Sequence, residues 1–507
     1  MGNFWLQPRT IVAYAVSLLA LAEIVDLTIV AVAIPQMMGS LGATIDSIAM
    51  VTTAYIVAAA IFIMLSGLVI RKYGMKRIIM ASGIIFLVSS ILCGQSDSLP
   101  EMIFFRIIQG IGGAFLPAVA QSYIAKNFVG QEQTKIMIVF SLVVVMGPVI
   151  GPVLGGLLVA NLNWRWIFYV NVPICFVGLA LISIYMKSDA IKKINIDYIS
   201  FAFMAIGIGL LEYFIDEGNS NGWFNSIEMI IILTTSLILI SFFIWRGLWG
   251  STVINFNIFK NANFVFSCLM MFVFMLFATA SFAYFPTMMQ NIFNYPVDTA
   301  GYITAPRGLA AVVTALFIPK ISNILGEKLV VVLGIFSFSI GCFMLSSYGP
   351  SVSMGYVITS MIFQGFGMMA FFVPMMQICF LGISNEENTD ASGVFNFFRN
   401  FGASVGTSVA ATTISHQIQV NYNDLGQHIS PYAHGYQLWI QNLQGVSETM
   451  QVAIAQLLVH QQSAFLSYLD TFYLCAIGML FIIWTPFILK THPDLTEHKD
   501  EDNHDNH

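Results

Sequence analysis

Charged side chains are scarce in this sequence. Only 9% of its 507 residues are Asp, Glu, Lys or Arg, whereas about 25% are charged in an average soluble domain. Hydrophobic residues make up 57% of the chain, and the mean hydropathy is +0.80. This composition excludes an ordinary soluble domain and predicts an all-α polytopic membrane protein. Nucleic acid is not an expected partner of such a chain.

Several familiar chemical signatures are also missing. The six cysteines show no CxxC spacing, no GxxxxGK[ST] phosphate loop occurs, and no Ser-His-Asp or His-metal constellation is evident. We therefore expect no disulfide, metal site or cofactor, no direct use of ATP, and no enzymatic activity. No cleavable signal peptide is visible, so the first apolar run is expected to remain as a helix.

Long apolar runs are abundant, and about 20 such residues cross the hydrocarbon core of a bilayer. An even number of spans puts both termini on one side. Sixteen of the twenty Lys and Arg residues lie at the termini or in connections on that side, which predicts that both termini are cytoplasmic. We predict fourteen spans, near residues 11–35, 47–70, 78–95, 100–124, 135–159, 164–187, 197–215, 227–246, 264–290, 299–321, 328–347, 353–382, 391–416 and 464–489.

A weak internal repeat divides the chain. The Gln-Gly-x-Gly of residues 109–112 recurs at 364–367, and Gly147 and Gly151 match Gly402 and Gly406 at the same offset of 255 residues. That offset equals eight spans, which predicts two six-helix bundles separated by two inserted helices. The expected domains are an N-terminal bundle over 1–187, the inserted pair over 188–250, a C-terminal bundle over 251–490 and a cytoplasmic tail over 491–507.

One connection is long. Residues 417–463 form an external stretch rich in Gln, Asn, His and Tyr, without Lys or Arg. Glu448 to His460 within it has the pattern of a short amphipathic helix. A solvated loop and a functional insertion both remain open for this stretch. The tail after Lys490 is charged and contains histidines, which is typical of a disordered end.

Two carboxylates lie within the first span. Asp26 is about 22 Å along a helix that starts near Ile11, and Glu23 shares its face because the two are three residues apart. Arg106 lies inside the fourth span, and an unpaired arginine there would be costly. We therefore predict that Arg106 pairs with Glu23 or Asp26 and that the group exchanges a proton. No histidine lies deep in a predicted span, and His416 is placed at a helix end.

Other residues carry weaker predictions. Polar groups within or ending spans are candidates for a substrate cavity: Gln36, Tyr55, Gln109, Gln121 and Asn396, with the intramembrane arginines Arg307 and Arg399 as either structural residues or substrate ligands. Closely spaced glycines leave a smooth ridge for helix contact, and prolines permit bending. This predicts a conformational seam at Gly147, Pro148, Gly151, Pro152, Gly155 and Gly156.

These motifs together resemble a known family. The glycine and proline run of the fifth span is similar to the antiporter motif of major facilitator superfamily exporters, and Arg106 with Gln109-Gly110 resembles their fourth-span motif. The loop motif Gly67, Arg71, Gly74 and Arg77 resembles their connection between spans 2 and 3. Residues 25–35 and 163–173, with 468–472 after the long loop, are similar to fourteen-span drug:proton antiporters, most of all the EmrB-type multidrug exporters of Gram-negative bacteria.

Three positions depart from or bear on that resemblance. The family normally carries an acidic residue where this chain has Arg71, which puts the usual charge-relay latch in doubt. Its usual Asn in the first span is Ala31. Arg307 occupies the span where relatives that export dications can carry an acid, so neutral, weakly acidic or singly charged lipophiles are the expected substrates.

The resemblance implies the major facilitator fold with 14 transmembrane helices and a proton-coupled antiporter that exports lipophilic drugs by alternating access. It also implies an inner-membrane location, with a periplasmic adaptor protein and an outer-membrane channel as partners. An uptake symporter for a metabolite or metal chelate on the same fold is the main alternative. A lipid-acting enzyme and a channel are disfavoured, because no catalytic cluster and no repeated filter is evident.

Overall fold

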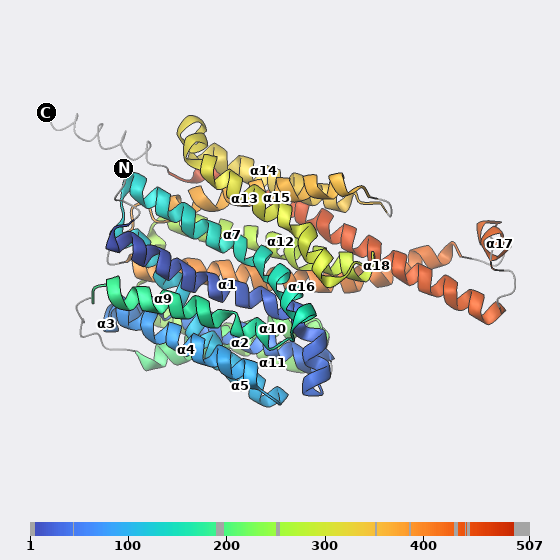
Figure 1. Ribbon diagram of the computed structural model, residues 1–507, viewed down its shortest axis with the longest axis horizontal. Helices are drawn as coiled ribbons and strands as arrows, with labels where there is room; N and C mark the ends of the chain where they lie inside the picture. The colour runs from blue at the N-terminus through green and yellow to red at the C-terminus, as the bar shows by residue number, and fades with distance from the viewer. Residues whose placement is uncertain are drawn as a thin grey trace.

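The computed structural model describes residues 6–43, 45–188, 197–249, 254–349, 352–384, 387–429, 434–441, 443 and 447–490. Side chains 31, 35, 45, 46, 49, 145, 148, 149, 297 and 298 lie outside that description, as does the predicted tail 491–507. All regular elements in the described ranges are helices, as the composition predicts. Most run along the long axis of the molecule (Figure 1).

The helices follow the chain in the order of the predicted spans. Three spans are each built from two consecutive helices, and three short 3-10 turns (η) accompany the long elements within the described residues. The elements are α1 (Pro8–Leu41), α2 (Ile45–Ile63), α3 (Ser66–Tyr73), α4 (Met75–Gln95), α5 (Leu99–Gly113), α6 (Phe115–Asn127), α7 (Gly130–Asn161), α8 (Trp166–Tyr169), α9 (Asn171–Tyr185), α10 (Tyr198–Glu217), η1 (Trp223–Asn225), α11 (Ile227–Trp249), η2 (Phe256–Lys260), α12 (Ala262–Asn291), α13 (Val297–Leu325), α14 (Glu327–Ser346), α15 (Met354–Cys379), α16 (Asn388–Gln427), α17 (His434–Gln441), α18 (Glu448–Phe481) and η3 (Thr485–Ile488).

Length and apolarity of the described helices do not by themselves confirm the predicted number of spans. Within the described residues, eleven helices are long and apolar enough to cross a membrane, or up to twelve if the pair from α2 and α3, bent by 57°, counts as one span. Helix α7 is not among the eleven, because the side chains of residues 145, 148 and 149 within it lie outside the described residues. The count of fourteen is therefore not confirmed, although every predicted span lies on a helix.

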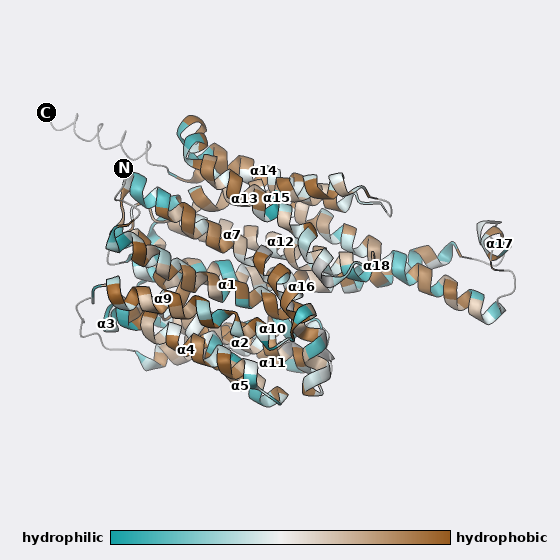
Figure 2. Cartoon of the chain, viewed as in Figure 1, coloured by the Kyte–Doolittle hydropathy of each residue, from teal (hydrophilic) through white to brown (hydrophobic). Residues whose placement is uncertain are grey.

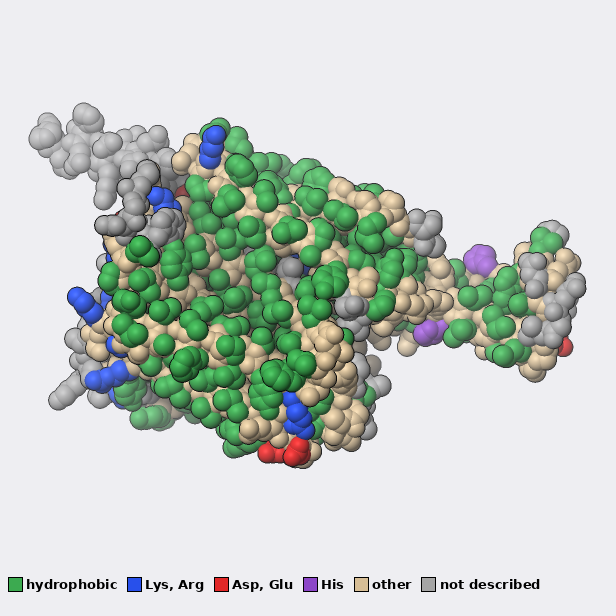
Figure 3. Space-filling model, in the orientation of Figure 1, with side chains coloured by type: hydrophobic (Ala, Val, Ile, Leu, Met, Phe, Trp, Pro, Cys, Tyr) green, Lys and Arg blue, Asp and Glu red, His purple; other side chains and the backbone are tan. Residues whose placement is uncertain are grey.

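Hydrophobic side chains are widely exposed on the body of the molecule. Hydrophobic side chains dominate the face in Figure 3, and the apolar colour of Figure 2 extends along the bodies of the helices. Lys and Arg side chains on that face gather mainly at the end where α1 begins, hereafter the terminal end (Figures 1 and 3). This is the pattern that a bilayer selects.

The inserted helix α10 lies between earlier and later parts of the chain, since it packs against both α2 and α16. On one side Thr53 of α2 donates a hydrogen bond to Asp216, and on the other Ser404 of α16 donates to Glu212 at 2.7 Å. Asp197 caps the start of α10 and pairs with Arg246 of α11 at 2.9 Å. The Ser200 hydroxyl and the Arg246 guanidinium lower the pKa of Asp197 to about 2.

The predicted loop 417–463 is largely helical over its described residues. Helix α16 continues to Gln427, and α18 begins at Glu448, so the two extend past the body of the molecule with α17 at the tip (Figure 1). The predicted helix over 448–460 is confirmed as the first part of α18. His416, predicted at a helix end, lies inside α16 instead. A drop in hydropathy marks where a helix leaves the membrane, but the backbone hydrogen bonds can continue in water.

Candidate buried charge site

The first helix brings both predicted carboxylates into the interior. Helix α1 packs against α6, α7 and α9, and its Pro8 occupies the first turn, where a missing N–H costs nothing. The side chains of Glu23 and Asp26 are 1% and 0% exposed. Neither faces lipid, which agrees with the expectation for intramembrane acids.

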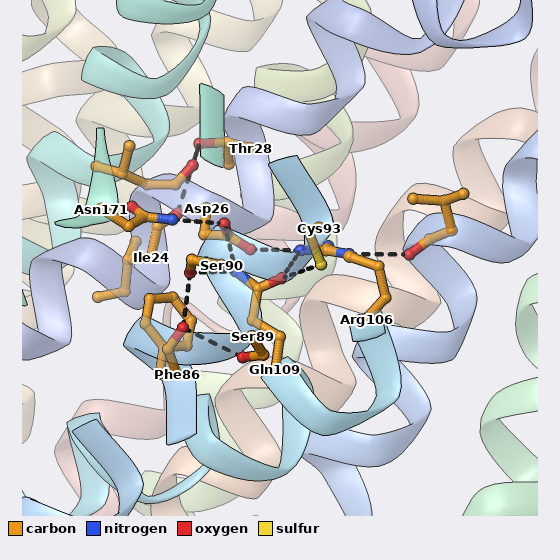
Figure 4. Close-up of polar contacts among 12 residues, drawn as sticks. Ile24, Asp26, Thr28, Phe86, Ser89, Ser90, Cys93, Arg106, Gln109 and Asn171 are labelled. Atoms are coloured by element: carbon orange, nitrogen blue, oxygen red, sulfur yellow. Dashed lines mark hydrogen bonds and ion pairs between the residues drawn. The ribbon is translucent and has the colours of Figure 1, made fainter. Parts of the chain in front are cut away.

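Asp26 is the centre of a hydrogen-bond network from three other helices (Figure 4). Arg106 of α5 donates from Nη1 to Asp26 Oδ2 at 2.5 Å. Gln109 of α5 and Asn171 of α9 donate from their amides to Asp26 Oδ1, at 2.9 and 2.8 Å. Ser90 of α4 accepts from the same Gln109 amide at 2.8 Å. The carboxylate is therefore charge-balanced and accepts hydrogen bonds at both oxygens.

Arg106 makes several contacts besides its ion pair with Asp26. Its guanidinium also donates to Gln109 Oε1 at 2.7 Å and to the carbonyl of Val51 at 3.1 Å, and it lies 4.2 Å from the centre of the Tyr55 ring. The side chain is 0% exposed. Its Nη2 is buried without a hydrogen-bond partner, so the ion pair with Asp26 is the main compensation for its charge.

Glu23 lies apart from this pair. Its Oε2 is buried without a hydrogen-bond partner, and the cation whose field reaches it is Arg399 of α16. Arg399 itself donates to Asn400 at 3.2 and 3.1 Å. The two acids of α1 therefore differ: Asp26 forms an ion pair with Arg106, whereas Glu23 has no ion pair among the described residues and is influenced by the charge of Arg399.

The other predicted cavity residues separate into three groups. Gln121 of α6 accepts from the Asn396 amide of α16 at 2.6 Å, and both are fully buried. Arg307 is buried on α13. Gln36 is exposed near the end of α1, where its amide donates to the carbonyl of Val159, so it is not part of the buried cluster.

The glycine ridge of α7 packs on α1. A Cβ at Gly147 would collide with Ile24, one at Gly151 would collide with Thr28, and one at Gly155 would lie 3.0 Å from Ile29 Cγ1. Thr28 reaches the carbonyl of Gly147 at 3.4 Å. The ridge therefore joins two helices of the same N-terminal set.

The remaining members of the predicted seam are placed differently. The contact of α7 with α13 runs through Pro152 and Val153, which face Gly301. Gly156 is buried, and the side chain of Pro148 lies outside the described residues.

The loop motif finds a partner across the molecule. Arg71 of α3 forms an ion pair with Asp390 at the start of α16, and Gly67 lies so close that a Cβ there would collide with Asp390. The backbone N–H of Asn255 donates to the same carboxylate at 3.2 Å. Gly74 adopts φ +85°, whereas Arg77 is exposed. The departure at Arg71 therefore leaves an ion pair in place.

Sequence reasoning missed Asn171 and Ser90. Asn171 lies inside the motif at 163–173, and a polar side chain in an apolar helix was the available signal. Metal chemistry gains no support, since no group of three or more His, Cys, Asp or Glu could hold an ion anywhere in the described ranges. The six cysteines are free and buried.

Comparison with known proteins agrees with this architecture. The family model described as Major Facilitator Superfamily matches residues 16–407. The multidrug export protein EmrB of Haemophilus influenzae is 30% identical over 483 residues, 93% of this chain and 94% of that protein. EmrB of Escherichia coli K12 is 30% identical over 459 residues, 89% of this chain and 90% of that protein.

Solved structures support the fold. The human organic anion transporter MFSD10 aligns with a TM-score of 0.60 at 12% identity, covering 93% of this chain and 99% of that one. At this identity the likeness establishes the fold alone. The chain is a transporter and not an enzyme, and it belongs to the major facilitator superfamily, among the multidrug exporters of the EmrB type.

Proposed function

We propose that this protein is a proton-coupled antiporter that exports lipophilic compounds from the cytoplasm by alternating access. The observation that supports the proposal most strongly is the buried Asp26–Arg106 pair with amides on both sides. A carboxylate at that depth is expensive, so it usually serves ion or proton movement. In this proposal Asp26 takes up a proton when the site opens to the outside and loses it to the cytoplasm.

The balance of charge explains how such a proton could drive movement. With Asp26 ionised, Arg106 is neutralised at 2.5 Å. Protonation of Asp26 would leave a buried cation without its counter-charge, a situation that costs about 3–5 kcal/mol when a buried pair is broken. A rearrangement that admits water or a substrate to Arg106 would relieve that cost. The two protonation states therefore favour different conformations.

Two bundles provide the moving parts in this proposal, one from α1–α9 and the other from α12–α18, with α10 and α11 inserted. Their cross-contacts include Arg71 with Asp390, Ser122 with Thr389 at 3.1 Å, and Gln121 with Asn396. These contacts lie on α3, α6 and the start of α16, and α3 is at the terminal end (Figure 1). They hold the terminal end closed, as expected for a state open to the opposite side.

Energy supply is adequate for export. One proton crossing 100 mV releases about 2.3 kcal/mol, and a hundredfold concentration of a neutral solute costs about 2.7 kcal/mol. A membrane potential somewhat above 100 mV and one proton per cycle would suffice.

The orientation and partners are part of the same proposal. The basic terminal end would face the cytoplasm under the positive-inside rule, in a bacterial inner membrane. The projection of α16 and α18 would then reach into the periplasm, where it is a candidate contact for an adaptor protein that leads to an outer-membrane channel. A groove of about 520 Å³ between these helices is lined by Ser415, Ile418, Gln419, Tyr422, Asn423 and His460.

The test is drug uptake into inverted vesicles with an imposed pH gradient. Wild-type protein is expected to accumulate a lipophilic drug inside such vesicles only when their interior is acidic. Asp26→Asn keeps the size of the side chain and one accepting oxygen but cannot bind or release a proton, so gradient-driven accumulation should disappear. Full accumulation by a folded Asp26→Asn variant would contradict the proposal. Movement in the opposite direction would favour the uptake symporter.

A further inference from the structure

The C-terminal helices repeat the frame of the buried charge site, but without its acid. Gln109 and Gln364 are separated by the repeat offset of 255 residues, and so are Asp26 and Ser281. The amide of Gln109 donates to Asp26, and the amide of Gln364 donates to Ser281 at 3.1 Å. The group that accepts a hydrogen bond from the glutamine amide is therefore a carboxylate in the N-terminal copy of the site and a hydroxyl in the C-terminal, or second, copy.

The helices around these glutamines correspond as well. Gln109 also donates to Ser90 of α4, and Gln364 donates to Cys342 of α14 at 3.6 Å. Ser90 and Cys342 are 252 residues apart. Thus α4 with α5 and α14 with α15 build equivalent frames around the two amides.

The arginine has moved to a different helix in the second copy. Met361 stands 255 residues after Arg106, while Arg307 of α13 stands 252 residues after Tyr55. Close approach confirms the second equivalence, because a Cβ at Gly110 would lie 2.5 Å from the carbonyl oxygen of Tyr55 and Gly365 makes the corresponding approach to the carbonyl of Arg307. The pair of Tyr55 and Arg106 in the first copy therefore corresponds to the pair of Arg307 and Met361 in the second copy.

Arg307 has no acid to balance it among the described residues. Its Nη2 lies 3.1 Å from Met361 Sδ, its guanidinium lies 4.4 Å from the centre of the Phe282 ring, and its Nε has no hydrogen-bond partner. The side chain is only 2% exposed. The ionisable groups that act on its charge are Cys342 and Tyr348, both ordinarily neutral.

A buried, permanently charged guanidinium requires a counter-charge. Thioether and aromatic contacts supply only weak compensation. In the first copy of the site the counter-charge is Asp26, and in the second copy Ser281 leaves that position neutral. Among the described residues no side chain supplies the missing negative charge, which leaves it to a bound anion or to a change of conformation.

We propose that Arg307, with Ser281 and Gln364 beside it, is an anion site that takes the carboxylate of a lipophilic acid or, in its absence, a chloride ion. The inference rests on the proposed export function and names one substrate class for it: singly charged organic acids. A guanidinium suits this group, because its planar fork matches both oxygens of a carboxylate. The neighbouring Phe282 and Met361 offer apolar and polarisable surface to the body of such a compound.

The test is equilibrium binding to the full-length protein in nanodiscs, with no proton gradient. The probes are 2-naphthoate and its neutral amide, 2-naphthamide, which share a ring system and differ in charge. Wild-type protein is expected to prefer the acid. Arg307→Gln should weaken 2-naphthoate binding about tenfold or more relative to 2-naphthamide, because a charged hydrogen bond is lost. Arg307→Lys retains the charge and should recover part of the preference.

A second variant tests the missing counter-charge directly. Ser281→Asp installs the acid that the first copy carries, so it should reduce the preference for 2-naphthoate, and by more than Ser281→Asn, which matches its size without charge. Exchanging chloride for methanesulfonate, which has no carboxylate, at constant ionic strength identifies the source of the anion. A chloride dependence that is lost in Arg307→Gln assigns chloride to the same site.

The results that would overturn the inference are distinct from failure of the export proposal. Equal affinity of the wild type for both probes would contradict it, and so would equal loss of both probes in a folded Arg307→Gln variant. Neither outcome bears on Asp26, since the assay uses no gradient. Loss of proton coupling is read only from the vesicle experiment.

Discussion

Replacement of Arg106 by Gln should destabilise the protein strongly, and a second replacement should restore it. Arg106→Gln removes the counter-charge of Asp26 at 2.5 Å and leaves a carboxylate buried at 0% exposure. Breaking such a pair from one side costs about 3–5 kcal/mol. With an entropy of unfolding near 2.1 cal/mol/K per residue, this corresponds to a fall of roughly 3–5 °C in the melting temperature of a 507-residue chain.

The double variant Asp26→Asn with Arg106→Gln removes both charges and keeps amides that can bond to Gln109. Its melting temperature should return to within about 1–2 °C of the wild type, since removal of both partners of a buried pair is often nearly neutral. The assay is thermal unfolding in one detergent, followed by loss of monodisperse protein. Additive losses in the double variant would refute the reasoning, because they would mean that the two side chains do not interact. An unchanged Arg106→Gln variant would refute it equally.

Three further outcomes follow from other contacts. Gly151→Leu should separate α7 from α1 and reduce drug efflux in cells at least several-fold, whereas Gly39→Leu, at a glycine with open space around it, should not. Arg71→Asp should weaken the closed terminal end and raise cysteine labelling there, and addition of Asp390→Arg should reverse the increase. Ser404→Ala should lower the free energy of unfolding by about 1–3 kcal/mol, because it leaves a buried carboxyl oxygen of Glu212 without its hydrogen-bond donor. An unchanged value in any of these three measurements would contradict the contact assigned to it.

The energetic cost of buried charge made part of the site predictable. An arginine and two acids inside apolar runs had to be neutralised, so the pairing of Arg106 with α1 followed from the sequence. The sequence did not indicate which of the two acids, Asp26 or Glu23, pairs with Arg106, because they lie about one turn apart on the same helix face. Asn171 could not be placed against Asp26 either, since that contact depends on how α9 packs beside α1.

Packing partners were the least predictable feature of the fold. The glycines of α7 indicate that some helix approaches closely, but they do not say which, and the approaching helix is α1 through Ile24 and Thr28. Apolar runs gave the positions of the helices well. They failed for residues 417–463, because hydropathy reports burial in lipid and not the continuity of a helix in water.

The central claim is that Asp26 releases or binds a proton in step with the substrate. The most direct measurement is the change in pH of a weakly buffered solution when a transported drug is added to purified wild-type and Asp26→Asn protein. We predict a proton release from the wild type that is absent in the variant, although the variant still binds the drug. Equal proton release from both proteins would contradict the claim.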